Sequence, residues 1–379
     1  MVSSELRNIV VIGGGFANNA LLSTLLPKLD SSKYIVTLID TRPFYVHQIA
    51  TARAITTDKG KLEDLILVPY DRLLTKPHRM VVGNVVSVHA ASQAAGATSG
   101  GEVELDDGSR VAYDILVVAT GSRWPDDFTF PETHDEIISW LRNSRDSINA
   151  ARNVVVAGGG SVGLEVAGEI RSFHPHVEVT VVQKGKGLLN GTYPSKFRNT
   201  LAQKAEAQGI KLIFEDMLVS EIPDKDGFVH TSNGKRLPAD RVIHAVGTKP
   251  NTSLLRSLGP DTLTSSGFVR VLPTLQLPSH PTIFAAGDII DWDEQKMAAK
   301  AGKHGTVIAA NILALTQGVN PSTKYTGFIE AIIVPLGPNG GAGYIPLFCG
   351  LAIHGGDWMA RFLKSADLMI TGARKRIGY

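Results

Sequence analysis

The sequence is almost devoid of cysteine, because its 379 residues include only Cys349. A single cysteine excludes an intrachain disulfide, a redox-active CxxC pair and an iron–sulfur cluster held by four thiolates. The composition favours a reducing compartment or is neutral about it. Any electron transfer by this chain must therefore use a bound organic cofactor.

A surplus of charge of one sign is also missing. The chain has 38 Lys and Arg residues against 36 Asp and Glu residues, a formal net charge of +2. Nucleic-acid binding normally needs a concentrated basic face, so we expect no nucleic-acid partner. The sequence has no HExxH motif and no cluster of His, Cys and Asp. We therefore expect no metal site.

Long apolar runs are absent as well. No run reaches the roughly 18 residues that a membrane-spanning helix needs. The first expected strand begins near Asn8, which leaves no room for a secretory signal, and Val2 excludes N-myristoylation. We expect a protein that is not secreted, has no transmembrane helix, and is cytoplasmic or peripheral at a membrane such as the mitochondrial surface.

What the sequence does contain is an internal repeat. Copy one opens with NIVVIGGG (8–15) and closes with YDILVVATG (113–121). Copy two opens with NVVVAGGG (153–160) and closes with ADRVIHAVG (239–247). Each opening is a β-branched run that leads into a glycine-rich turn and then a helix-like stretch. The repeat predicts two comparable βαβ units in tandem.

Between the openings and closings, each copy contains the same kinds of element. The patterns predict second strands at 34–40 and 177–183 and hairpins at 103–114 and 228–240. A flexible loop is predicted at 90–101.

The glycines of each turn have separate tasks in a dinucleotide site. The first allows the tight turn, the second lets a pyrophosphate approach the backbone, and the third lets helix and strand pack closely. Copy two is complete, with glycines at 158, 160 and 163, whereas copy one has Gly13 and Gly15 but Asn18 in third place. We expect both turns to bind a dinucleotide at a helix N-terminus, with the first helix slightly displaced.

The ends of the second strands indicate the nucleotide at each turn. Asp40 ends the strand of copy one and is placed to accept hydrogen bonds from an adenosine ribose. Copy two has Gln183 there, followed by Lys184 and Lys186. Without a carboxylate nothing repels a 2′-phosphate, so NADPH is at least tolerated. The lysines either attract that phosphate or are solvated loop charges.

A third element follows the repeat. The stretch TIFAAGDIID (282–291) is an apolar strand that ends in Gly287 and Asp288, and residues 296–313 have helical spacing. In proteins that bind FAD end to end, an Asp at this place holds the ribityl or phosphate part of the flavin chain. The N-terminus of the next helix then favours negative charge on the flavin pyrimidine.

Together these motifs resemble the flavoprotein reductases with two dinucleotide domains. Within them the chain is most similar to the apoptosis-inducing-factor-like group that includes the ferroptosis suppressor proteins. The strings that carry the similarity are GGGSVGLEVAGEI (158–170), GDIIDWDEQKMAAKAG (287–302), LGPNGGAG (336–343) and FLKSADL (362–368).

The resemblance implies an α/β fold with two Rossmann-like dinucleotide-binding domains, the second inserted in the first, and a C-terminal interface region. We expect an FAD domain at 1–123 and 255–325, an NAD(P) domain at 124–254, and the interface region at 326–379. The implied activity is transfer of a hydride from NAD(P)H to FAD and then of electrons to a small acceptor, often a quinone at a membrane surface.

The resemblance also implies roles for individual residues. Glu165 matches a glutamate near the nicotinamide and flavin, and it is alternatively a helix residue on a solvated face. His47 and Arg53 match positions beside the flavin, although His47 is alternatively a packed loop histidine. Lys296 matches the lysine that leads the flavin-facing helix. Lys364 matches a lysine near the acceptor and is alternatively a surface charge.

Further positions match cofactor-binding residues of the family. The positions that match FAD-binding residues are Gly13, Gly15, Asp40, Thr120, Gly121, Gly287 and Asp288. The positions that match NAD(P)-binding residues are Gly158, Gly160, Gly163 and Gly247.

The sequence leaves open the environment of the C-terminal residues, the oligomeric state and the choice among three functions. Trp358, Met359, Phe362 and Leu363 share a helical face near basic residues, which either rests on an anionic membrane or faces the core above a basic exposed end. Homodimer formation is also an open expectation. The alternative functions are a nucleotide-sensing signalling protein with weak reductase activity and a reductase of a protein electron acceptor.

Overall fold

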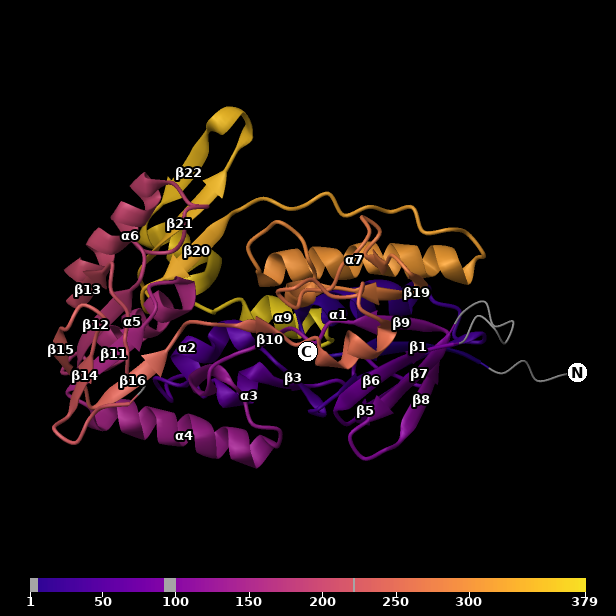
Figure 1. Ribbon diagram of the computed structural model, residues 1–379, viewed down its shortest axis with the longest axis horizontal. Helices are drawn as coiled ribbons and strands as arrows, with labels where there is room; N and C mark the ends of the chain where they lie inside the picture. Colours follow the sequence, from indigo (N-terminus) through magenta and orange to yellow (C-terminus); the bar gives the residue numbers. More distant parts are fainter. Residues whose placement is uncertain (1–5, 92–99, 221) are drawn as a thin grey trace, which may run out of the picture.

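The computed structural model describes residues 6–91, 100–220 and 222–379. A mainly parallel sheet with one antiparallel edge strand, a second, parallel sheet and a C-terminal antiparallel sheet form its framework (Figure 1). The loop predicted at 90–101 lies largely outside the described residues. The α/β class with repeated Rossmann-like units is confirmed, since both copies of the repeat form parallel strand–helix units.

The first sheet joins strands from both ends of the chain, in the order β18-β19-β9-β1-β2-β5. Strands β1, β2 and β9 pair in parallel, and β19 adds in parallel beside β9. Segments some 270 residues apart therefore complete one sheet. The bounds are β1 Arg7–Ile12, β2 Tyr34–Asp40, β5 Arg79–Val82, β9 Ile115–Val118, β18 Gln276–Leu277 and β19 His280–Ala285.

Helices α1 (Phe16–Leu25) and α7 (Ala298–Thr316) pack together on one face of this sheet (Figure 1). On the other side lies an antiparallel meander of β6 (Val85–Ala90), β7 (Gly101–Leu105) and β8 (Arg110–Tyr113). The hairpin predicted at 103–114 is the β7–β8 pair.

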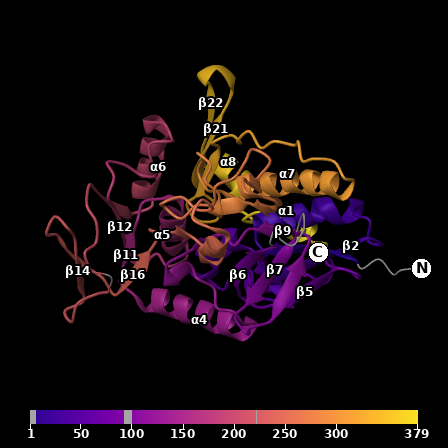
Figure 2. The same ribbon diagram turned by 45° about the vertical axis from the view of Figure 1, so that its right-hand side comes forward.

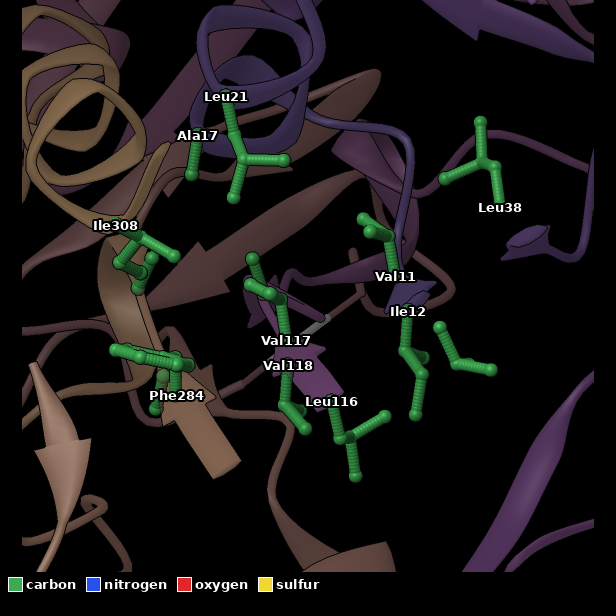
Figure 3. Packing of buried hydrophobic residues seen from close by; sticks show 14 of the residues in the cluster. Val11, Ile12, Ala17, Leu21, Leu38, Leu116, Val117, Val118, Phe284 and Ile308 are labelled. Carbon is green, nitrogen blue, oxygen red and sulfur yellow. The ribbon is translucent and has the colours of Figure 1, made fainter. Parts of the chain in front are cut away.

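Apolar side chains fill the layer between these helices and the sheet. Leu21 of α1 and Ile308 of α7 lie over Val117 of β9 and Phe284 of β19, and all four are fully buried (Figure 3). Strands buried on both faces read as continuous Val/Ile/Leu runs, which is why residues 9–12 of β1 and all of β9 are apolar.

The second sheet is parallel, in the order β13-β12-β11-β16. Its strands are β11 Asn153–Ala157, β12 Glu178–Gln183, β13 Ile210–Phe214 and β16 Arg241–His244. Helices α4 (His134–Ala150), α5 (Ser161–Phe173) and α6 (Ser195–Ala207) pack around it. Thr133 and Glu136 form a capping box that fixes the start of α4. The second predicted hairpin is the pair β14 (Phe228–His230) and β15 (Arg236–Pro238).

The chain crosses between the two sheets along a short antiparallel pair, β10 (Ser122–Arg123) with β17 (Lys249–Pro250). The second sheet thus forms from residues between two adjacent crossings, while the first sheet includes strands before and after them. We keep the domain boundaries 1–123, 255–325, 124–254 and 326–379 as a proposal, which these crossings support.

Short elements and the C-terminal region complete the fold. The C-terminal sheet β20-β21-β22 ends in a hairpin that stands away from the body (Figure 1, Figure 2). A π-helix, Arg361–Ser365, follows α8 directly. The remaining bounds are β3 Phe44–Val46, α2 Thr51–Ala54, α3 Glu63–Ile66, β4 Leu67–Pro69, β20 Ile332–Pro335, β21 Gly341–Pro346, β22 Ala352–Gly355, α8 Asp357–Ala360 and α9 Ile370–Arg376.

The apolar face predicted in the tail is divided between solvent and the interior. Trp358 and Phe362 are 79% and 76% exposed and stack on each other at 5.9 Å. Met359 packs beside Gly343 and Gly355. Two residues of this face are thus exposed and one packs inward, so the alternative in which the whole face turns toward the core does not hold. Among the described residues, no helix combines the length and apolar character needed to cross a bilayer.

The α1–α7 contact predicts a stability effect. A methyl group at Gly305 would lie 2.0 Å from the carbonyl oxygen of Ala17, so G305A must push the helices apart. We expect a loss of about 1–3 kcal/mol in the free energy of unfolding, measured by thermal or denaturant unfolding. The control is G302A, whose methyl group would meet only Ala20 Cβ at 3.8 Å. If G302A destabilises as much as G305A, close packing is not the cause.

Candidate cofactor and substrate site

A cavity of about 1180 Å³ lies between the two parallel sheets and the C-terminal region. Its volume exceeds the range of about 300–1,000 Å³ that is usual for one small ligand. Both glycine-rich turns, the ends of β2, β9, β12 and β16, the start of α7 and part of the C-terminal region line it. The cavity therefore has room for more than one ligand.

The turn after β1 brings a bare backbone to the cavity. Gly13 has φ +93°, and a methyl group there would lie 2.5 Å from the Ala119 carbonyl oxygen. At Gly15 an added methyl group would meet no atom within 4 Å, although this residue lines the cavity. Gly15 is also the N-cap of α1 and provides no side-chain cap. The first N–H groups of α1 are thus left to a ligand.

The turn after β11 repeats this geometry. Gly158 has φ +111°, and a methyl group there would lie 2.8 Å from the Ala245 carbonyl oxygen. Gly160 is the N-cap of α5, provides no side-chain cap and has open space beside it. The two turns therefore present two equivalent helix N-termini to the same cavity.

The third turn position differs between the copies. A methyl group at Gly163 would lie 2.0 Å from the Gly158 carbonyl oxygen, so α5 packs closely on its turn. At the corresponding place in α1, the whole side chain of Asn18 fits between helix and turn. Its Nδ2 donates hydrogen bonds to the carbonyl oxygens of Ile12, at 2.9 Å, and Gly13, at 2.6 Å. The Asn18 amide thus ties α1 to its turn by hydrogen bonds, and the slight displacement of α1 stays a prediction.

The strand ends hold the middle glycine of each turn. Asp40 accepts a hydrogen bond from the Gly14 N–H, and Gln183 Oε1 accepts one from the Gly159 N–H at 3.0 Å. Both side chains line the cavity. Burial raises the pKa of Asp40, while its backbone hydrogen bonds oppose that shift. The side chains of Lys184 and Lys186 are solvent-exposed instead.

The third sequence motif brings another helix N-terminus to the cavity. Asp288 lines it and accepts a hydrogen bond from Ser122 Oγ at 2.9 Å. Ala298 and Ala299, in the first turn of α7, also line it, and the N-cap Met297 provides no side-chain cap. Lys296 Nζ donates to the carbonyl oxygen of Ile290 at 2.8 Å. Burial lowers the pKa of this lysine.

One ion pair lies on the cavity wall where α5 meets the π-helix. Lys364 Nζ is 2.7 Å from Glu165 Oε1, and both residues line the cavity. Glu165 is 7% exposed. Burial raises the pKa of Glu165, and the charge of Lys364 opposes the shift. Neither residue is a solvated surface charge, so those alternatives are excluded.

Two predicted residues do not line the cavity. His47 is 1% exposed, with Tyr45 Oη 2.9 Å from Nδ1 and the Leu368 carbonyl oxygen 2.8 Å from Nε2. Its ring is therefore engaged in the interior, as the packed-histidine alternative has it. Arg53 is also buried, and its guanidinium pairs with Glu169. His47 and Arg53 thus lie behind the described lining of the cavity, and their place beside the flavin stays a prediction.

The other predicted cofactor residues fall on the cavity, except Gly163, which packs α5 on its turn. Thr120, Gly121, Gly247 and Gly287 all belong to the lining. Sequence reasoning missed an apolar part of the wall that comes from the C-terminal region. These residues are Ala331, Ile332, Ile333, Leu363 and Met369. Of these, only Leu363 belongs to a stretch that the sequence singled out, FLKSADL.

Two strand–turn–helix nucleotide sites and a third helix N-terminus on one cavity define the class of α/β oxidoreductases that bind two nucleotide cofactors. The profile of the pyridine nucleotide-disulphide oxidoreductase family matches residues 7–305, and the chain belongs to this family. FAD is its cofactor, and NAD(P)H is its co-substrate.

The relatives agree with this assignment. The FAD-dependent oxidoreductase FVFD30 of Flammulina velutipes is 41% identical over 325 residues, which are 86% of this chain and 99% of that protein. Ferroptosis suppressor protein 1 of Homo sapiens is 28% identical over 99% of this chain and 96% of its own length. The resemblance to the group that includes the ferroptosis suppressor proteins is thereby confirmed.

Solved structures share the fold. The water-forming NADH oxidase of Lactobacillus brevis bound to NADH superposes with a TM-score of 0.70 at 19% identity, covering 90% of this chain and 75% of that chain.

The residues present fit both nucleotides. At Gly15 and Gly160, beside uncapped helix N-termini, a backbone with no Cβ leaves open space into which a phosphate fits. Neither helix has an acidic residue in its first turn that would repel an anion. FAD fits the first turn, which is hydrogen-bonded to Asp40 and shares the cavity with Asp288. NAD(P)H fits the second turn, which is hydrogen-bonded to Gln183.

The buried position of His47 predicts a pH effect on stability. Burial lowers its pKa in the folded state. The unfolded chain then takes up a proton near pH 6.5 that the folded chain does not, so the free energy of unfolding falls as the pH drops below about 6.5. H47Q should reduce this fall by up to about 1.4 kcal/mol per pH unit, measured by urea unfolding between pH 7.5 and 5. An unchanged slope would contradict neutral burial of His47.

Proposed function

We propose that this protein transfers a hydride from NAD(P)H to bound FAD and then passes electrons to a small acceptor, a quinone. The observation that carries the proposal is the shared cavity. Three uncapped helix N-termini reach it, from α1, α5 and α7, and the C-terminal region supplies an apolar wall. This combination suits two anionic nucleotides and a third ligand that is flat and apolar.

The protein contributes binding and electrostatics to the reaction. Bound FAD supplies a centre that accepts a hydride and returns electrons one or two at a time. The N-termini of α1 and α5 hold the pyrophosphate groups, and the N-terminus of α7 favours negative charge where it meets the cavity. Asp288 binds a hydroxyl-bearing chain, and the apolar wall excludes water.

The ion pair of Glu165 and Lys364 is the polar feature beside this apolar wall. Lys364 Nζ has donors left beyond its bond to Glu165, so it can donate to a carbonyl oxygen of the acceptor. Glu165, in turn, holds the ammonium group in place. A quinone matches this surface, because it joins an apolar ring to two carbonyl oxygens.

The acceptor must be external to the chain. Cys349 is the only cysteine of the sequence, so no dithiol can take up the electrons. A protein acceptor would have to dock on the outside of this protein and bring the edge of its own cofactor up to the cavity. The apolar lining beside Lys364 favours a small molecule instead.

Peripheral membrane contact of the tail and homodimer formation stay predictions. The exposed stack of Trp358 and Phe362 supports the first, as does the exposed Phe348 at the tip of the β21–β22 hairpin. Aromatic side chains of this kind favour the interface of a bilayer.

The first test follows both half-reactions. We expect the purified, FAD-loaded protein to lose its flavin absorbance on addition of NADH or NADPH and to regain it with a water-soluble benzoquinone. K364M should slow the quinone step about 10- to 100-fold, since a hydrogen bond from a charged group is lost. Stopped-flow absorbance measures both steps.

The matched control is K211M. Lys211 forms a 2.8 Å ion pair with Glu178 on the surface, so its loss should leave both steps unchanged. An FAD-loaded protein that NADH and NADPH leave fully oxidised would contradict the proposal. Reduction far slower than about 10 per second with every acceptor, together with a nucleotide-dependent oligomer, would favour the signalling alternative.

The second test concerns the choice between NADH and NADPH. Gln183 occupies the place that Asp40 has in the first turn, and each accepts a hydrogen bond from a turn N–H. Q183E keeps that acceptor but adds a charge that repels a 2′-phosphate. We expect KM for NADPH to rise about tenfold or more and KM for NADH to change less than threefold, in steady-state assays.

K184A is the control for this charge effect. Lys184 is exposed and does not belong to the described lining of the cavity, so its loss should change both KM values little. Equal KM changes for the two nucleotides in Q183E would show that the site does not read the 2′ position here.

A further inference from the structure

We propose that Arg53 and Glu169 are positioning residues that hold Lys364 on Glu165. The predicted effect on quinone reduction rests on the proposed function, whereas the placement of Lys364 by Arg53 and Glu169 rests on contacts alone. Neither Arg53 nor Glu169 belongs to the described lining of the cavity. They act through the residues next to them.

Arg53 uses its whole guanidinium group inside the protein. Nε lies 3.0 Å from both carboxylate oxygens of Glu169, and Nη2 lies 2.8 Å from Oε1. Nη2 also donates to the Ser365 carbonyl oxygen at 2.6 Å, and Nη1 donates to the Ala366 carbonyl oxygen at 3.2 Å. Arg53 and Glu169 are 6% and 1% exposed. One side chain thus ties α2, α5 and the end of the π-helix together.

Both ends of this clamp adjoin the cavity ion pair. Ser365 follows Lys364 directly, and Glu169 follows Glu165 by one turn on the same face of α5. The carbonyl groups at the end of a helix need donors from elsewhere, and Arg53 supplies them here. Fixing these carbonyl oxygens fixes the backbone from which Lys364 reaches the cavity.

Charge gives the clamp a second task. Glu165 and Glu169 are neighbouring buried carboxylates, and each is paired with its own cation, Lys364 and Arg53 respectively. Burial raises the pKa of Glu169, and Arg53 opposes that shift. Because Arg53 occupies Glu169 on both oxygens, Lys364 is left to Glu165. Without Arg53, Glu169 would compete for the ammonium group.

The local backbone agrees with such a role. Residues Arg361–Ser365 form a π-helix, a conformation that is rare and frequently found at functional sites. Ser365 is fully buried, and its hydroxyl donates to the Gly340 carbonyl oxygen at 2.9 Å. The segment that presents Lys364 is therefore held from two sides.

The test uses the FAD-loaded full chain and compares R53K with R145K. Arg145 also binds a carboxylate through two nitrogens, Nη2 and Nη1 to Glu63 at 2.8 and 3.2 Å, and its Nε donates to the Ala54 carbonyl oxygen at 2.8 Å. It does not belong to the described lining of the cavity. Both substitutions keep the positive charge and lose the planar fork. R53K and R145K should lower Tm comparably. A difference between them in the behaviour of Lys364 is then due to the place of Arg53 beside the Glu165–Lys364 pair.

The first readout needs no turnover. Labelling of Lys364 by an amine-reactive reagent, followed by mass spectrometry, should be at least fivefold faster in R53K than in the parent or R145K. E169Q serves as a second variant if R53K does not fold, and it should also accelerate labelling. Unchanged labelling of Lys364 in the folded variant would overturn the proposal.

The second readout is a double-mutant cycle on quinone reduction by NADH. R53K should lower kcat by about tenfold to 100-fold with little change in KM for NADH. Since Arg53 acts through Lys364, R53K combined with K364M should be no slower than K364M alone. Additive effects would overturn the inference. If the parent protein reduces no quinone, the proposed function fails, whereas the labelling result still decides the role of Arg53.

Discussion

The cavity depends on unpaired backbone N–H groups at helix N-termini. Helices α1, α5 and α7 all begin at the cavity wall, and their N-cap residues Gly15, Gly160 and Met297 provide no side-chain cap. Such ends carry partial positive charge and unsatisfied donors. An anionic ligand satisfies them better than water does. The parallel sheets are what bring these ends together, because the carboxyl ends of parallel strands meet at one edge.

The same constraint explains the architecture around the site. The chain builds one sheet, leaves it through β10, builds the second sheet and returns through β17. The insertion allows two nucleotide turns to face one another across a single cavity. A third sheet and the segment that follows it then supply what the turns lack, an apolar wall and a lysine.

Buried charges connect these three parts of the molecule. Arg53 and Glu169 are almost without solvent contact, and burial of charges is costly unless each has partners. Here every nitrogen of the guanidinium group has an acceptor. Such pairs contribute less to overall stability than to geometry. In this protein the geometry in question is that of Glu165 and Lys364.

The family is named for disulfide chemistry, yet this chain has one cysteine. The cofactor site is preserved without the dithiol. The cavity instead offers an apolar surface and an ammonium group. The chain thus keeps the two-nucleotide fold of the family, and under the proposed function the C-terminal region would receive the acceptor.

Local patterns determined much of this protein. The turns at Gly13, Gly15, Gly158 and Gly160 could be assigned from spacing, since a strand, a tight turn and a helix involve neighbouring residues only. The same holds for the AGD motif and both hairpins. Asn18 was an anomaly in sequence, and its amide proved to satisfy the carbonyl groups at the end of β1.

Only the tertiary structure decided the rest. Lys364 meets Glu165 across 199 positions, and Arg53 meets Glu169 across 116, distances at which no periodicity carries information. His47 and Arg53 come soon after Asp40, which accepts a hydrogen bond from the first turn. Contacts with the tail, and for Arg53 also with α5, nevertheless direct both side chains inward. The apolar wall at 331–333 has no motif either. The sequence alone determines a local conformation, such as a turn, where residues adjacent in the chain fix it. Whether a side chain faces the cavity or the core depends on elements that meet only in the folded chain.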